Sequence, residues 1–233
     1  MTNEEIQSVM NSTFGGLAIF CRDLELDESL ISKYQPNQIL MEIGFTDVTH
    51  KVGGLAKNCR YLVASSKGKD LSMFSQNPEF GHIVIPSGAF FKVLDIHKEK
   101  GKTQILLLNI PKEGIPIFAN SKINIEDQVI EKGKEIFKRT ISSKPLQELQ
   151  SKDWIERTSF PIGMSQEGDF FLNADKKGTV QKESRTKNEQ TKEVPLKEEK
   201  KQNTESIAES QTEIKAEKPK EKKKGFWNKL FGN

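Results

Sequence analysis

Residues 82–110 read HIVIPSGAFFKVLDIHKEKGKTQILLLNI, and this stretch decides the fold class. A first apolar run ends at the turn residues 86–88, and residues 90–96 then alternate apolar and polar side chains. The turn residue Gly101 separates them from a second apolar arm at residues 103–110. Period-two alternation bounded by Gly and Pro is typical of antiparallel strands. The stretch therefore predicts a strand followed by a β-hairpin.

Helical patterns flank this β region on both sides. Residues 3–12 and 125–141 carry apolar side chains at helical spacing, with Asn124 placed to cap the second helix and Pro145 beyond its end. Residues 154–171 retain aromatic and aliphatic side chains, so they are expected to pack as a ragged C-terminal edge of the domain. Shorter patterns predict strands at residues 17–21, 39–41, 44–46 and 59–64, and helical turns at residues 27–31 and 52–57. The elements together predict one mixed domain of helices and strands.

The composition of the chain changes near residue 171. Residues 175–224 contain no aromatic residue, and about half of their side chains are charged. Such a segment cannot bury enough apolar surface to offset the conformational entropy of an ordered chain. We therefore predict a folded domain over residues 1–171, a disordered charged linker over residues 172–224 and a C-terminal tag over residues 225–233.

Charge and cysteine content limit the classes of partner and compartment. The formal net charge of the 233 residues is only +3, and acidic and basic residues are interspersed along the linker, so no nucleic-acid partner is expected. Glu4 and Glu5 stand where a signal peptide carries basic residues, and no run approaches the roughly 20 apolar residues of a membrane span. We expect a cytoplasmic protein in which Cys21 and Cys59 are reduced thiols.

The C-terminal tag combines apolar and basic side chains. Its apolar residues fall at helical spacing directly after a lysine cluster, and they are Phe226, Trp227, Leu230 and Phe231. Leaving such side chains exposed without a use would favour aggregation. The tag is therefore expected either to lie on an anionic membrane surface or to enter a groove on a protein partner. The alternative is that it folds back onto its own domain.

Three short motifs between residues 20 and 110 occur in a fixed order. Residues 20–23 read FCRD, residues 44–49 read GFTDVT and residues 78–88 read PEFGHIVIPSG. In this order they resemble the mono-ADP-ribosyltransferase domain of bacterial exotoxins and their arginine-specific vertebrate relatives. That family carries an arginine at the end of its first strand, a Ser-Thr-Ser element, and a Glu-x-Glu pair before an apolar strand. The resemblance implies an α+β fold with a split two-sheet core, flanking helices and NAD as the cofactor.

The resemblance assigns two residues to NAD binding. Arg22 matches the family arginine, whose planar fork grips the NAD phosphates and ribose in a way that a lysine cannot. Where the family has Ser-Thr-Ser, this chain reads Asp47-Val48-Thr49, so Thr49 alone keeps a hydroxyl group for the nicotinamide pocket. Arg22 and Thr49 are therefore the candidate cofactor-binding residues.

The catalytic motif of the family is altered in this chain. Phe80 and His82 stand at the positions of the two glutamates, and Glu79 lies one residue before the first of them. The second glutamate in the family stabilises the positive charge that develops as the glycosidic bond breaks, which a histidine does poorly. Successive side chains of a strand point to opposite faces, so Glu79 could replace either glutamate only through a bulge. Glu79 and His82 are the candidate catalytic residues, and no metal site is predicted because His and Cys lack ligand spacing.

These observations lead to three function hypotheses. The first is a degenerate ADP-ribosyltransferase-like domain that binds a nucleotide or a protein and is recruited by its C-terminal tag. The second is an active NAD-dependent mono-ADP-ribosyltransferase or NAD glycohydrolase that uses Arg22, Thr49 and a rearranged Glu79 or His82. The third is a non-catalytic adaptor that acts through its tail. An open cleft between Arg22 and His82 favours the first two, whereas a cleft filled by Phe80 and its neighbours favours the third.

Overall fold

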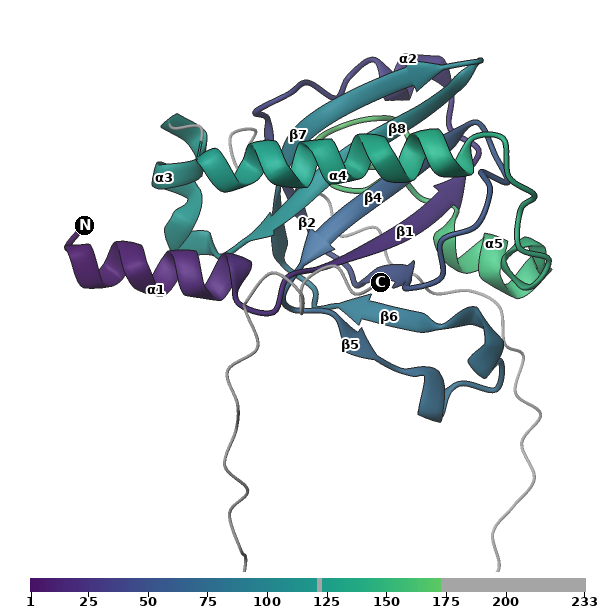
Figure 1. Cartoon of the computed structure of the whole chain (residues 1–233), viewed down its shortest axis with the longest axis horizontal. Helices are drawn as coiled ribbons and strands as arrows, with labels where there is room; N and C mark the ends of the chain where they lie inside the picture. The colour runs from purple at the N-terminus through teal and green to yellow at the C-terminus, as the bar shows by residue number, and fades with distance from the viewer. Residues whose placement is uncertain (121–122, 173–233) are drawn as a thin grey trace, which may run out of the picture.

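A computed structural model describes residues 1–120 and 123–172 of the chain (Figure 1). The predicted linker, apart from its first residue Leu172, and the tag residues Phe226, Trp227, Leu230 and Phe231 lie outside the described residues. The elements run α1 (Asn3–Phe14), β1 (Ala18–Leu24), α2 (Glu28–Ile31), β2 (Ile39–Glu42), β3 (Thr46–Thr49), β4 (Cys59–Ser65), β5 (Lys69–Asp70), β6 (His82–Ile85), β7 (Ala89–Glu99), β8 (Lys102–Ile110), α3 (Ile115–Asn120), α4 (Asn124–Thr140) and α5 (Lys152–Thr158). Short 3-10 turns lie at Ser72–Phe74, Pro78–Phe80, Lys112–Gly114 and Glu148–Gln150. The fold class is α+β, as predicted.

The strands form a sheet that is nearly divided in two. Within the described residues its order is β2-β7-β8-β4-β1-β3-β6-β5, with β4 and β8 parallel and the other pairs antiparallel. β1 pairs with β4 along its whole length, whereas β1 and β3 share only the pair Cys21↔Thr49. The sheet therefore splits at this contact into a five-stranded part and a three-stranded part, in agreement with the predicted two-sheet core.

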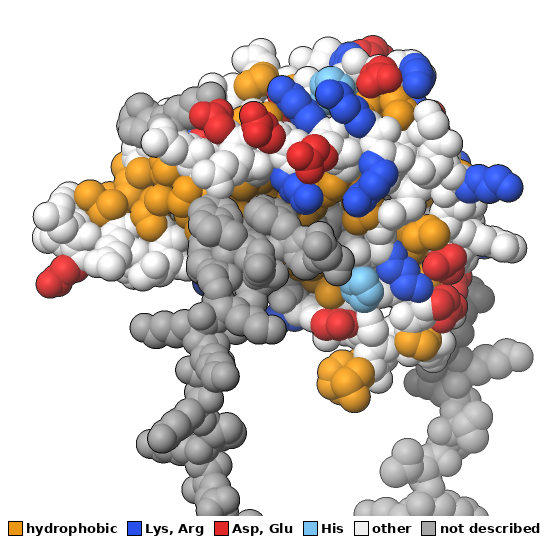
Figure 2. Space-filling view, in the orientation of Figure 1, with side chains coloured by type: hydrophobic (Ala, Val, Ile, Leu, Met, Phe, Trp, Pro, Cys, Tyr) orange, Lys and Arg blue, Asp and Glu red, His pale blue; other side chains and the backbone are white. Residues whose placement is uncertain are grey.

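Different segments cover the two faces of the larger part. On one face α4 lies across the strands, as Figure 1 shows, and α1 and α3 complete a cluster that contains Phe14, Leu62, Phe118 and Ile136. Acidic and basic side chains are interspersed over the outer surface of α4 (Figure 2). The cluster on the other face contains Leu40 and Tyr61 together with Ile162 and Met164 from the segment after α5. None of the described helices is long and apolar enough to cross a bilayer.

The clearest sequence patterns are confirmed. The stretch of residues 82–110 forms β6 and the β7–β8 hairpin, and the predicted helix at 125–141 is α4. Both patterns are local, because alternation and helical spacing are set by neighbours in the sequence. The predicted cap is wrong, because Asn124 is the first residue of the helix and Ile123 is its N-cap. Residues 154–171 do pack on the domain, as expected, but their first part is the ordered helix α5.

One predicted element is wrong. Residues 52–57 form no helical turn and instead run as a loop against the chain that follows α4. The Gly54 N–H donates to the Lys144 carbonyl (3.0 Å), and a Cβ at Gly54 would lie 2.0 Å from the Ser143 carbonyl oxygen. The small residues in this stretch allow two backbones to approach closely, which sequence periodicity does not reveal.

Candidate functional site

Arg22, the predicted NAD-binding arginine, lies near the end of β1 and is only 5 % exposed. Its Nε donates a hydrogen bond to the Thr158 carbonyl (3.0 Å), and its Nη2 donates to the Phe160 carbonyl. The guanidinium forms no ion pair with any of the residues that the structure describes. Burial lowers the pKa of Arg22 below its ordinary value, because the charged form loses its hydration. Two donor groups of the predicted phosphate fork are thus used by main-chain oxygens.

The carbonyls that bind Arg22 belong to α5 and the residue pair that follows it. Ser151 caps this helix by accepting a hydrogen bond from the Trp154 N–H (3.4 Å), as serine commonly does at an N-cap. Trp154 is 1 % exposed, and its ring lies 5.4 Å from that of Phe80 and 5.8 Å from that of His82, between centroids. The indole therefore fills the space beside the two positions where the family carries its glutamates.

The segment after α5 is held along the same face by polar contacts. The Tyr34 hydroxyl donates to the Ile162 carbonyl (2.8 Å) and lies 2.6 Å from the Tyr61 hydroxyl. The Gly163 N–H donates to Glu42 Oε2 (2.8 Å). Burial raises the pKa of both tyrosines, so their hydroxyl groups stay protonated at alkaline pH values where an exposed tyrosine ionises. The face of the sheet that carries Arg22 is therefore covered by the chain itself.

His82 and Thr49 are also buried and bound to protein groups. His82 Nε2 lies 2.6 Å from Asp47 Oδ1, and Asp47 also lies 3.6 Å from Arg157 Nη1. The Thr49 hydroxyl donates to the Phe80 carbonyl (2.5 Å) and accepts from the Lys51 N–H (3.0 Å). These contacts give both side chains a structural part in joining β3 to β6 and to the loop before it.

Glu79 lies outside this cluster. It is exposed within the 3-10 turn Pro78–Phe80, and the strand begins only at His82. Gly81 ends the turn with a left-handed backbone (φ 58°), a conformation that other residues rarely adopt. The argument that Glu79 could replace a glutamate only through a strand bulge therefore does not apply, because Glu79 lies in a turn and the strand begins at His82. Within residues 1–120 and 123–172, no group of three His, Cys, Asp or Glu side chains could hold a metal ion.

Two hollows remain at the surface beside the covered face. The larger has a volume of about 630 Å³, the smaller has about 380 Å³, and Arg157 lines both. Charged side chains in the larger hollow are Arg22, Glu42, Asp47, Arg157 and Glu167. His82 and Asp153 line the smaller one together with Phe74 and Phe80. Arg22 and His82 thus contribute to separate hollows on the two sides of Arg157.

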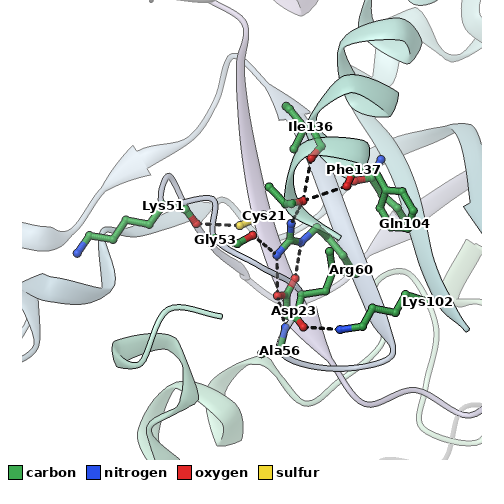
Figure 3. Close-up of polar contacts among 12 residues, drawn as sticks. Cys21, Asp23, Lys51, Gly53, Ala56, Arg60, Lys102, Gln104, Ile136 and Phe137 are labelled. Carbon is green, nitrogen blue, oxygen red and sulfur yellow. Dashed lines mark hydrogen bonds and ion pairs between the residues drawn. The ribbon is translucent and has the colours of Figure 1, made fainter. Parts of the chain in front are cut away.

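A second buried arginine, Arg60, lies on the face of the sheet opposite to Arg22. Figure 3 shows its polar contacts. Arg60 of β4 donates to both carboxylate oxygens of Asp23, at 2.5 and 2.7 Å, and also to the Gly53 carbonyl and the Thr140 hydroxyl (3.0 Å each). Asp23 in turn accepts a hydrogen bond from the Ala56 N–H (3.1 Å). Burial opposes the charge of Arg60, but the bonds to Asp23 outweigh it and raise the pKa of Arg60. This network holds the residue 50–58 loop against α4.

Sequence reasoning missed the residues that fill the predicted cleft. Trp154 was expected only to pack at an edge, and no role was expected for Arg157 or Glu42. A tryptophan within an otherwise strongly polar stretch, residues 147–159, was the available signal for a buried anchor. The sequence offers no signal that this anchor contacts His82, because the contact joins segments far apart in the chain.

No model of a known protein family matches the sequence, and no curated protein matches it significantly. Among solved structures, the type III effector XopAI of Xanthomonas axonopodis pv. citri is similar at a TM-score of 0.37 and 20 % identity, over 40 % of this chain and 44 % of that one. The ADP-ribosyltransferase HopU1 of Pseudomonas syringae pv. Tomato DC3000 gives 0.37 and 21 %, over 40 % and 45 %. Exoenzyme S of Pseudomonas aeruginosa, in a complex with human 14-3-3 protein beta and carba-NAD, gives 0.36 and 14 %, over 44 % and 53 %.

The chain therefore spans about half of the length of these solved structures, or less. TM-scores of this size do not place the chain in a family. The functional conclusion has to come from the geometry around Arg22 and His82.

Proposed function

We propose that this protein is a non-catalytic adaptor on an ADP-ribosyltransferase-like scaffold, the hypothesis that a filled cleft favours, and that it acts by binding another protein segment. The observation that supports this is the use of Arg22, whose Nε and Nη2 donate to the Thr158 and Phe160 carbonyls. A phosphate-gripping fork needs its paired donors free and aimed at the ligand. With those donors on main-chain oxygens and Trp154 beside His82, the residues present do not fit NAD.

The electrostatics of the altered motif support the same conclusion. Breaking the glycosidic bond of NAD builds positive charge, and a pre-placed carboxylate is the group that stabilises it. His82 takes the place of one glutamate and contacts the Trp154 ring, while Glu79 is exposed on the neighbouring turn. Loss of one such electrostatic contact typically costs about 10²-fold or more in rate. Recruitment through the C-terminal tag remains a prediction of the sequence.

The test is NAD binding and consumption by the full chain. Calorimetry with NAD is expected to show no binding. Nicotinamide release is expected to be no higher than that of the Arg22→Lys variant, which keeps the charge but lacks the planar fork. The matched pair Glu79→Gln and Glu25→Gln removes one exposed carboxylate in each case. NAD binding that requires Arg22 would show a nucleotide-binding domain, and nicotinamide release that falls with Glu79→Gln and not with Glu25→Gln would show an enzyme. Either result would overturn the proposal.

A further inference from the structure

The two hollows on either side of Arg157 form one surface with unusually exposed aromatic side chains. Phe45 and Phe160 border the larger hollow and are 66 % and 49 % exposed, and Phe74 borders the smaller one and is 86 % exposed. We call this region the Arg157 surface. Large apolar side chains that are exposed together around concave sites mark binding surfaces more often than scattered single ones do. The surface therefore has the shape and the anchors to hold an apolar segment.

The charge of the Arg157 surface is mainly acidic. Four carboxylates line the two hollows, those of Glu42, Asp47, Asp153 and Glu167, against the guanidinium groups of Arg22 and Arg157. The Glu42 carboxylate is largely buried and is bound by the N–H groups of Gly44 (3.0 Å) and Gly163 (2.8 Å). Glu42 forms no ion pair within the part of the chain that the structure describes. A ligand that joins aromatic side chains to positive charges would complement this surface.

The chain itself carries such a ligand. Residues 222–231 read KKKGFWNKLF, which places three lysines directly before the aromatic pair Phe226 and Trp227. Phe171 lines the larger hollow and Leu172 is the last described residue, so the described chain ends one residue beyond the rim of this surface. About 50 residues separate the rim from the tag, and a chain of that length extends to at most roughly 170 Å. The tag can therefore reach the surface, and the tether raises its effective concentration there.

We propose that residues 222–231 dock on the Arg157 surface of their own chain. Trp227 and its apolar neighbours would lie among Phe45, Phe74 and Phe160, and the lysines would face the carboxylates. This inference rests on the proposed function, because it treats the covered cleft as a protein-binding surface, and it names the segment that binds there. A partner protein with a similar basic and aromatic segment would have to displace the tag.

The test uses the full chain labelled with 5-fluorotryptophan. The chain contains two tryptophans, so ¹⁹F NMR gives two resonances, which Trp227→Phe assigns. Trp154 is buried and serves as the internal reference for protection from a soluble paramagnetic agent. We expect the Trp227 resonance to be protected nearly as well as that of Trp154, and independently of protein concentration.

Paired variants decide whether the Arg157 surface causes that protection. Phe45→Ser combined with Phe74→Ser changes exposed side chains, so the fold is preserved, and should increase the relaxation of Trp227 by the agent severalfold. Ile6→Ser removes an exposed apolar side chain of α1 and should leave it unchanged. Asp153→Asn should weaken protection in low salt more than in high salt, because exposed charges are screened.

Three results would overturn the inference. A Trp227 resonance that is as accessible as free 5-fluorotryptophan would show no docking. Protection that appears only with vesicles containing anionic phosphatidylserine would assign the tag to membranes, and protection that rises with concentration alongside a dimeric mass would assign it to a second copy. The NAD assays do not depend on Trp227, so failure of the inference and failure of the proposed function are distinguishable.

Discussion

Two arginines are buried in the described part of the chain, and they lie on adjacent strands and have different roles. In the register of β1 and β4, Asp23 pairs with Arg60 and Arg22 pairs with Tyr61, so the two guanidinium groups point to opposite faces of the sheet. Arg60 is neutralised by a bidentate bond to Asp23, whereas Arg22 is bound by the carbonyls of residues 158 and 160. The charge of Arg22 is bound by main-chain oxygens, and the Asp47 and Glu42 carboxylates favour it without forming an ion pair.

Arg60 therefore forms an ion pair within the core, whereas Arg22 joins β1 to the chain at the end of α5. Removing the charge of Arg60 would leave the Asp23 carboxylate without its counter-charge. Loss of one partner is the costly way to break a buried ion pair. Removing Arg22 would leave two carbonyls without donors but would also relieve the burial of a charge that has no ion-pair partner among the described residues. Arg22 stands at the position predicted for an NAD-binding arginine, but it binds residues 158 and 160 of its own chain.

The largest expected effect is that of Arg60→Ala. Because the variant leaves Asp23 without its counter-charge and α4 without its link to the sheet, it should lower the free energy of unfolding by about 3 to 5 kcal/mol. Urea unfolding measured by circular dichroism checks this value. The control Arg139→Ala removes an exposed arginine of α4 and should change stability by less than about 0.5 kcal/mol. Equal losses in both variants would contradict the comparison.

Arg22→Ala should have a smaller and more local effect. Two unsatisfied carbonyls predict a loss of about 1 to 3 kcal/mol, with hydrogen exchange rising in residues 152–171 before it rises in β4. The matched control is Arg157→Ala, which removes a half-exposed arginine from α5, the helix whose Thr158 carbonyl binds Arg22. Uniform exchange across the whole domain in Arg22→Ala would show that this arginine belongs to the core.

The two cysteines lie on opposite faces of the sheet, and their ionisation makes the stability of the domain depend on pH in the alkaline range. Cys21 lies on the Arg60 face and Cys59 on the Arg22 face, and burial raises the pKa of each thiol to about 12. Because the unfolded thiols ionise near pH 9 and the folded ones do not, the stability they contribute is complete below pH 9 and is lost as the pH rises toward 12.

Unfolding measured between pH 10 and 11 should therefore show a loss that approaches about 1.4 kcal/mol per pH unit for each thiol. The double variant Cys21→Ala with Cys59→Ala should have a correspondingly flatter profile. A single replacement that removes all of the slope would mean that one of the two faces opens to solvent in the native state.

The smallest effect is expected for an ion pair at the surface. Lys98 and Glu28 contact each other with both side chains more than half exposed. Solvent screening and the side-chain entropy that the contact costs limit its contribution, so Lys98→Ala should change the unfolding free energy by at most about 1 kcal/mol. A salt titration of wild type and variant measures it. A loss as large as that of Arg60→Ala would contradict the view that burial sets the value of these contacts.

The sequence by itself determined the elements that depend on near neighbours. Alternation along residues 82–110 predicted β6 and the β7–β8 hairpin, and helical spacing predicted α4. The motifs also located Arg22, His82 and Thr49 on neighbouring strands, since β1, β3 and β6 do adjoin. Loop 52–57 escaped prediction because its conformation depends on contact with the chain after α4.

Only the tertiary structure decided what the site residues do. The partner of Arg22 Nε lies 136 residues further along the chain, and its oxygen belongs to the main chain, which carries no signal of residue type. The ring of Trp154 meets His82 only because α5 packs against β1 and β3. Local patterns specify helices and strands because the repeat of apolar side chains is set by residues that are near neighbours in the sequence. The occupant of a cleft is specified by contacts between distant segments, which depend on how the whole sheet is covered.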